Sequence, residues 1–102
     1  MSKRLLFLED LVQKGKADSF ARYALALEYK SLGRVDDALA AFGALKAVDP
    51  KYVPQYLMCG TMLLDAGRAE DAKSWLQEGL VVARAAGDSK AAGEISDALA
   101  RA

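Results

Sequence analysis

One short stretch of the chain returns later in the sequence, and this repeat limits the fold more than any other feature. Residues 33–38, with the sequence Gly-Arg-Val-Asp-Asp-Ala, return as residues 67–72, with the sequence Gly-Arg-Ala-Glu-Asp-Ala. A fixed period of this size is typical of stacked supersecondary units, and a period of about 34 residues matches a helix–turn–helix unit. Such units present surfaces to other molecules, so the repeat favours binding over catalysis.

Length and composition limit the chain to one small globular domain. It has 102 residues, of which 53% are hydrophobic and 27% charged. The 14 Lys and Arg residues balance 14 Asp and Glu residues, so no net field favours nucleic acid or an anionic membrane. The apolar run at residues 5–8 stops at Glu9 and is too short for a signal peptide or a membrane span. We therefore expect a cytoplasmic protein.

The residue inventory argues against an enzyme. The chain has no histidine and one cysteine, Cys59, which we expect to be buried. Catalytic dyads with histidine, histidine metal ligands and an internal disulfide are thereby excluded. No phosphate-binding glycine loop or metal-ligand spacing is present, and the acidic residues at positions 36, 37, 70 and 71 lie at helix starts, where the helix dipole favours them. We expect no catalytic residues, no cofactor and no metal.

Apolar periodicity together with helix-capping and helix-ending residues predicts six helices, at residues 3–14, 19–32, 35–48, 53–66, 69–86 and 89–101. Gly33 and Gly67 join paired helices, because glycine adopts the left-handed conformation that turns the chain. Asp18 or Ser19 can cap the second helix. On the first helix Leu6 lies about 100° off the apolar stripe and is expected to be exposed. That stripe contains Leu5, Phe7, Leu8, Leu11 and Val12.

Small and large residues recur in the same register. Small residues lie midway along the first helix of each pair and near the start of the second, where they let the helices approach closely. A large apolar side chain then fills the space beside them. The small residues are Ala26 and Gly60, then Ala38 and Ala72, and the large ones are Phe42 and Leu76. Trp75 is expected to pack beneath the sixth helix.

Residues 19–50 and 53–84 resemble two tetratricopeptide repeats. The family pattern is matched by the small residues and by Tyr29, Gly33, Ala38, Phe42 and Pro50. The second copy departs from it, with Leu63 in place of the tyrosine and Arg84 in place of the proline. The resemblance implies an all-α fold, a short right-handed α-solenoid of antiparallel helix pairs. We expect one domain, residues 1–102, with an N-terminal half-repeat helix at 3–14, repeats at 19–50 and 53–86, and a C-terminal capping helix at 88–101.

The resemblance also implies a function in protein–protein interaction. In this family the first helices of successive repeats line a concave groove that holds an extended peptide or a helix of another protein. Carried over by position, the groove residues are Phe20, Tyr23, Leu27, Lys30, Leu57, Met58, Thr61 and Leu64. We expect a non-catalytic interaction module or scaffold whose partner is another protein, with neither nucleic acid nor a membrane as partner.

Two alternatives remain open. In the first, the protein is a self-associating structural protein, and another copy occupies the groove or the first helix. In the second, the apolar stripe of Phe20, Tyr23, Ala24 and Leu27 is covered inside the chain, by the first helix or by the sixth. Recognition of a chaperone's C-terminal carboxylate is not expected, because the matching positions, Tyr23, Leu27 and Met58, lack the lysine, asparagine and arginine that such recognition needs.

Overall fold

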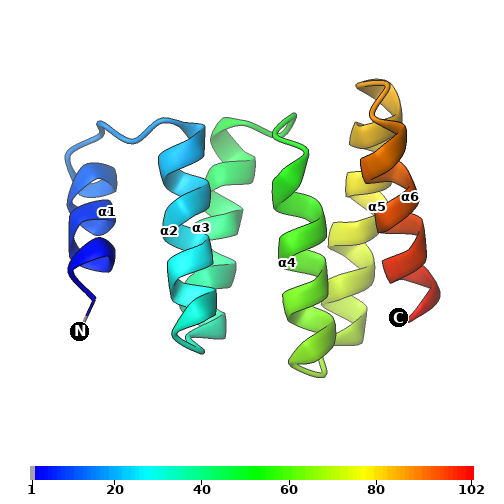
Figure 1. Cartoon of the computed structure of the whole chain (residues 1–102), viewed down its shortest axis with the longest axis horizontal. Coiled ribbons are helices and arrows are strands. Elements are labelled where there is room, and N and C mark those ends of the chain that lie inside the picture. The colour runs from blue at the N-terminus through cyan, green and yellow to red at the C-terminus, as the bar shows by residue number, and fades with distance from the viewer. Residues whose placement is uncertain (1) are drawn as a thin grey trace. The chain divides into compact units, whose positions relative to one another are not determined.

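The computed structural model describes residues 2–102, which form six α-helices and no strand (Figure 1). The helices are α1 (Lys3–Gln13), α2 (Ser19–Ser31), α3 (Val35–Val48), α4 (Pro54–Asp65), α5 (Ala69–Ala85) and α6 (Ser89–Ala100). Every boundary lies within one residue of the prediction. The predicted all-α fold is confirmed.

Side chains cap three of the helices. Asp18, and not Ser19, caps α2: its carboxylate accepts a hydrogen bond from the Ala21 N–H at 2.8 Å. Ser19 instead donates its hydroxyl to the Asp49 carboxylate at 2.6 Å, which ties the start of α2 to the end of α3. Equivalent caps from Ser2 and Asp88 begin α1 and α6. These bonds satisfy backbone donors that a helix start leaves unpaired.

The repeat is visible in the turns after α2 and α4. Gly33 and Gly67 have positive φ angles of 74° and 76°, as predicted. In both turns the glycine N–H and the N–H of the following arginine donate to carbonyls of the last helical turn, at 2.8–3.0 Å. Each arginine then pairs with an aspartate in the next helix; the pairs are Arg34–Asp37 and Arg68–Asp71. The same backbone and side-chain contacts therefore recur with the period of the sequence repeat.

The chain divides into two compact units, the first ending at Asp49 and the second running from Pro50 to Ala102. In the first unit α2 packs against both α1 and α3 (Figure 1). Leu5 and Leu8 of α1 are buried in one cluster with Ala24 and Leu25 of α2. Phe42 of α3 is fully buried. The first unit thus has an apolar core on both sides of α2.

In the second unit α5 packs against α4, and α6 packs against both. Gly60 of α4 lies against Leu76 of α5, as the small-to-large pattern predicted. Trp75 is buried, with its ring centroid 5.9 Å from that of Tyr56. Its expected packing beneath α6 stays a prediction. Cys59 is buried, as expected.

Residues 2–102 lack two kinds of feature. No helix there is long and apolar enough to cross a membrane. No group of three or more His, Cys, Asp or Glu side chains in the same range is placed to hold a metal ion. The prediction that residues 1–102 form one domain of two repeats remains untested. Met1, which that range includes, lies outside the described residues.

Candidate functional site

The predicted site residues of the first unit lie on the side of α2 that its neighbours leave open. Phe20 is 67% exposed, whereas Tyr23, Leu27 and Lys30 are half-buried. The Tyr23 ring packs edge-on against Phe42, with the ring centroids 6.4 Å apart, so α3 holds this side chain in place. The open side of α2 is therefore apolar, with one lysine, and is partly accessible.

The alternative that α1 covers the apolar stripe of α2 holds for part of the stripe. Ala24 is buried in the cluster with Leu5 and Leu8 of α1. Phe20, one helical turn earlier, remains exposed. Tyr23 and Leu27 keep part of their surface accessible. The first helix therefore covers one edge of the stripe and leaves the rest open.

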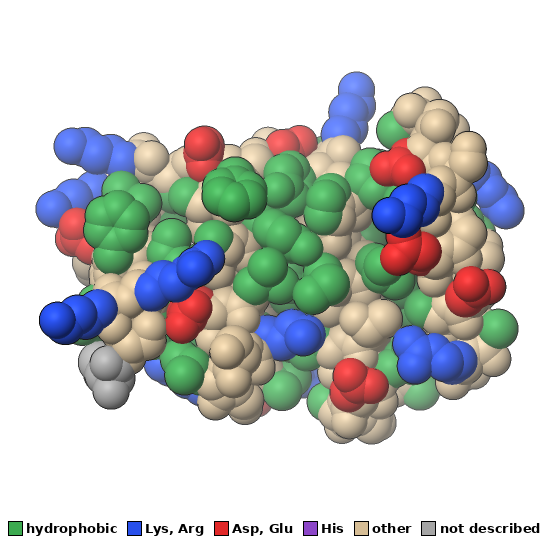
Figure 2. All heavy atoms as spheres, viewed as in Figure 1, with side chains coloured by type: hydrophobic (Ala, Val, Ile, Leu, Met, Phe, Trp, Pro, Cys, Tyr) green, Lys and Arg blue, Asp and Glu red, His purple; other side chains and the backbone are tan. Residues whose placement is uncertain are grey.

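The predicted site residues of the second unit lie along α4. Leu57, Met58, Thr61 and Leu64 are all half-buried, although α6 packs against this helix. The Thr61 hydroxyl donates back to its own helix, with the Leu57 carbonyl at 2.9 Å and the Met58 carbonyl at 3.3 Å. The Thr61 hydroxyl proton is therefore already engaged in a hydrogen bond within α4. Figure 2 shows hydrophobic side chains gathered over α4.

The eight predicted residues therefore lie on two helices, with one set in each unit. Each set is partly accessible on its own helix. A single groove that joins α2 to α4 stays a prediction.

One feature of the first unit was missed from the sequence: an apolar hollow of about 360 Å³ between α1 and α2. Its lining residues are Arg4, Phe7, Leu8, Leu11, Phe20, Ala21 and Ala24. We call it the α1–α2 hollow.

Phe7 belongs to the apolar stripe expected on α1, but it is 63% exposed, whereas Leu5 and Leu8 of the same stripe are buried. At about 100° per residue, Phe7 is turned well away from Leu5, which is buried against α2. The angle between these two positions on the helix was the signal in the sequence that could have indicated the exposure of Phe7. Leu6, expected to be exposed, is 50% exposed. Figure 2 shows hydrophobic side chains on the surface over both α1 and α2.

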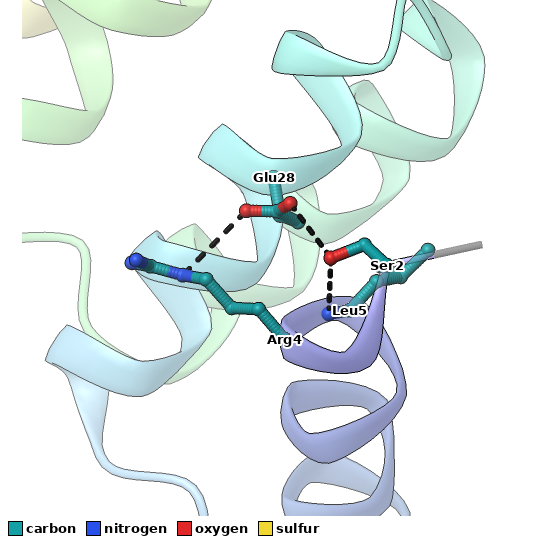
Figure 3. Close-up of polar contacts among 4 residues, drawn as sticks. All are labelled: Ser2, Arg4, Leu5 and Glu28. Atoms are coloured by element: carbon teal, nitrogen blue, oxygen red, sulfur yellow. Dashed lines mark hydrogen bonds and ion pairs between the residues drawn. The ribbon is translucent and has the colours of Figure 1, made fainter.

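Polar contacts at one end of the hollow hold the start of α1 against α2 (Figure 3). The Ser2 hydroxyl donates to Glu28 Oε1 at 3.1 Å and accepts from the Leu5 N–H at 3.2 Å. Arg4 Nε lies 3.5 Å from Glu28 Oε2, and the Arg4 side chain stays 66% exposed. Glu28 therefore anchors a largely exposed guanidinium that lines the hollow.

A second polar contact joins the same two helices. The Tyr29 hydroxyl of α2 donates to the Glu9 carboxylate of α1. The Arg34 guanidinium carbon lies 4.8 Å from the centre of the Tyr29 ring. Burial, followed by the hydrogen bond to Glu9, raises the pKa of Tyr29 to about 12. Tyr29 therefore stays protonated and keeps donating to Glu9 at neutral pH.

Paired helices joined by repeated glycine turns define the chain as a helical-repeat protein with exposed apolar surface. Similarity to solved structures shows which family of helical-repeat proteins it belongs to. The crystal structure of a tetratricopeptide repeat domain protein from Salinibacter ruber is 36% identical to this chain, with a TM-score of 0.75. The match covers 83% of this chain and 94% of that one. A solution structure of such a domain protein from the same organism is 37% identical, with a TM-score of 0.76, and the match covers 82% and 85% of the two chains.

A solution structure of a protein from Bordetella parapertussis is 26% identical, with a TM-score of 0.83. That match covers 99% of this chain and 88% of the other. No family model matches the chain, and a search of curated proteins finds no match either. On the likeness to the Salinibacter ruber structures, the chain belongs to the tetratricopeptide repeat family. Domains of this family serve in general as protein-interaction modules.

Proposed function

We propose that this protein is a non-catalytic interaction module that binds a peptide or a helix of another protein through the open sides of α2 and α4. One observation carries the proposal. Three pairs of side chains one repeat period apart on the two helices are matched in accessibility. Tyr23 and Leu57 are both half-buried, as are Leu27 and Thr61. The same holds for Lys30 and Leu64. Each unit thus offers an open face in the same register.

The chemistry of these faces favours an apolar segment as the ligand. Tyr23, Leu27, Leu57 and Met58 keep accessible apolar surface, and a ligand that covers this remaining surface gains free energy in proportion to the apolar area removed from water. Tyrosine is enriched among the residues that dominate binding energy at protein interfaces. The packing of Tyr23 against Phe42 holds its ring in advance, which lowers the entropy cost of binding.

Self-association remains the second candidate, and it is favoured by the exposed side chains of α1. Leu6 is 50% exposed and Phe7 is 63% exposed, and a second copy that covered α1 would remove both from water. Sedimentation equilibrium at micromolar and near-millimolar concentration separates the two candidates. A monomer at both concentrations favours a foreign partner, whereas a concentration-dependent dimer favours self-association.

A peptide selection tests the proposed surface directly. Short random peptides displayed on phage are selected on the intact chain, and the affinities of the best binders are then measured by fluorescence anisotropy. We expect Tyr23→Ala combined with Leu57→Ala to weaken binding at least about tenfold, which is about 1.4 kcal/mol. Val81→Ala is the control, because Val81 is 67% exposed but lies on α5. Binding that survives the double substitution, in a variant whose helical circular dichroism is intact, rules out this surface.

A further inference from the structure

We propose that the exposed side of α1 pairs with the same side of α1 in a second copy of the chain, with the two helices antiparallel. The proposal rests on self-association, the second candidate function named above. It goes beyond that candidate, because it states which residues meet and in which direction the helices run. Three observations carry it: an exposed apolar centre, the order of the charges around it, and a charge pattern that opposes the helix dipole.

Four exposed residues within the segment 3–10 share the side of α1 that faces away from α2. We call them the outer face of α1; they are Lys3, Leu6, Phe7 and Asp10. At about 100° per residue, their positions fall within an arc of about 100° that is centred about half a turn from Leu5 and Leu8. Those two leucines are buried against α2. The outer face is therefore the side of α1 that its own unit leaves open.

The centre of the outer face is apolar. Leu6 is 50% exposed and Phe7 is 63% exposed, because α2, which packs against α1, covers neither of them. Two adjacent large apolar side chains in water mark a surface that gains free energy when it is covered. A second α1 that crosses the first at these residues covers both side chains with its own Leu6 and Phe7. The same contact buries the exposed apolar surface of both copies.

Charges of opposite sign flank this apolar centre symmetrically. Lys3 lies three residues before Leu6, and Asp10 lies three residues after Phe7. In an antiparallel pair centred between Leu6 and Phe7, each Lys3 lies beside Asp10 of the second copy, and the contact occurs twice by symmetry. A parallel pair would place Lys3 beside Lys3 and Asp10 beside Asp10, which is unfavourable. The outer face is therefore complementary to itself in the antiparallel direction only.

Both charged side chains are available for this contact. Lys3 is exposed, and no carboxylate of residues 2–102 pairs with it. Asp10 Oδ2 lies 2.9 Å from Lys14 Nζ, but the Asp10 side chain remains 51% exposed. A carboxylate has two oxygens that accept hydrogen bonds, and an exposed pair within one helix contributes little. The contact with Lys14 therefore leaves Asp10 able to accept a second cation.

The helix dipole does not account for the charges of α1. A helix start favours acidic side chains and a helix end favours basic ones. The helices α3 and α5 follow this rule at both ends. In α1 the first turn has no acidic residue and the last turn has no basic one, so Lys3 and Asp10 oppose the dipole. In an antiparallel pair each basic start lies beside the acidic end of the other helix, which makes the same charges favourable.

Charge exchange between two variants tests the pairing. Lys3→Glu and Asp10→Lys each bring like charges together at both ends of the pair, and each is expected to weaken dimerisation at least about tenfold. An equimolar mixture of the two variants has opposite charges at both ends and is expected to form a heterodimer. A chain with both substitutions is expected to dimerise like the parent. Sedimentation equilibrium extends to near-millimolar concentration, because an interface of one short helix gives a weak dimer.

Matched variants separate pairing from folding. Lys3→Glu and Asp10→Lys bring the charges of α1 into agreement with the helix dipole, so both variants are expected to keep the circular dichroism of the parent. Lys90→Glu makes the same charge change in the first turn of α6 and is expected to leave dimerisation unchanged. Phe7→Ala is expected to weaken dimerisation at least about tenfold. Val81→Ala, at a 67% exposed position of α5, is expected to have no effect.

The remaining outcomes separate this pairing from the proposed function. A parent chain that is monomeric at every concentration overturns the pairing and leaves the proposed peptide-binding surface standing. A dimer that persists in Phe7→Ala but dissociates when Tyr23→Ala and Leu57→Ala are combined uses α2 and α4, which also overturns the pairing. Charge variants that dimerise as tightly as the parent exclude the antiparallel contact. Loss of the dimer in both single charge variants, with recovery in the doubly substituted chain, supports it.

Discussion

Gly79 of α5 packs directly against Tyr56 of α4, and the contact leaves no room for a side chain. A β-carbon at Gly79 would lie 2.3 Å from the Tyr56 β-carbon and 3.3 Å from Ile95 Cδ1 of α6. Gly60 is similar, since a β-carbon there would lie 2.4 Å from Leu76 Cδ2. In the second unit, glycines therefore permit the close approach of the helices.

We expect Gly79→Ala to destabilise the protein, because the added methyl group meets a β-carbon that cannot move without its backbone. Overpacking of this kind costs about 1–3 kcal/mol. Gly93→Ala is the control: Gly93 lies within α6 with nothing within 4 Å of its β-carbon position, so alanine is expected to stabilise by about 0.5–1 kcal/mol. Urea unfolding followed by circular dichroism measures both. A Gly79→Ala variant as stable as the parent contradicts the packing of α5 against α4.

Phe42→Ala is expected to lower the free energy of unfolding by about 3–5 kcal/mol, because it leaves a cavity in the first unit. Phe42 is fully buried, and its ring supports Tyr23. Phe20→Ala makes the same chemical change at a 67% exposed position and is expected to stay within about 0.5 kcal/mol of the parent. Chemical denaturation compares the two variants. Similar losses from both would mean that Phe42 does not lie in the core.

The stabilising contribution of Tyr29 is expected to disappear at high pH. The folded pKa, about 12, lies above the ordinary value of 10.0, so the unfolded chain loses the proton first as the pH rises. The contribution is therefore complete below pH 10 and is lost as the pH rises toward 12. Tyr29→Phe, which lacks both the proton and the bond to Glu9, serves as the reference.

We expect the parent to exceed Tyr29→Phe in stability by about 0.5–1.5 kcal/mol at neutral pH, the ordinary contribution of one hydrogen bond. Urea unfolding of both proteins at a series of pH values up to 12 gives this difference directly. All other side chains are the same in both proteins, so their effect largely cancels in the comparison. A difference that stays constant across the series would show that Tyr29 is not perturbed by its place between α1 and α2.

Asp18→Ala is expected to cost about 1 kcal/mol, because the Ala21 N–H loses its hydrogen-bond acceptor at the start of α2. Asp18→Asn is the matched control, since asparagine caps helices about as well as aspartate. Thermal unfolding followed by circular dichroism ranks the three proteins. If asparagine proves as damaging as alanine, the carboxylate charge stabilises α2 and the capping bond does not.

The helices and turns were predictable because their signals are local. Asp18 and Gly33 mark the ends of α2 by interactions that reach no further than one helical turn, and Gly67 repeats the turn of Gly33. The pairing of Gly60 with Leu76 was also predictable, because small and large residues recur at one spacing. The predicted binding residues keep part of their surface accessible on α2 and α4, and their role in binding and the groove that would join them stay predictions.

The sequence by itself determined which segments are helical, where they turn and which small residues let paired helices approach, because each of these depends on backbone preferences or on a repeated spacing. Only the tertiary structure decided which face of α1 is covered. Leu5 and Phe7 are both apolar residues of one helix, yet α2 buries the first and leaves the second 63% exposed. A helical period shows which residues share a face, but the neighbouring helix decides which face is buried. For the same reason the α1–α2 hollow and the position of Arg4 in its lining emerged only from the packed structure.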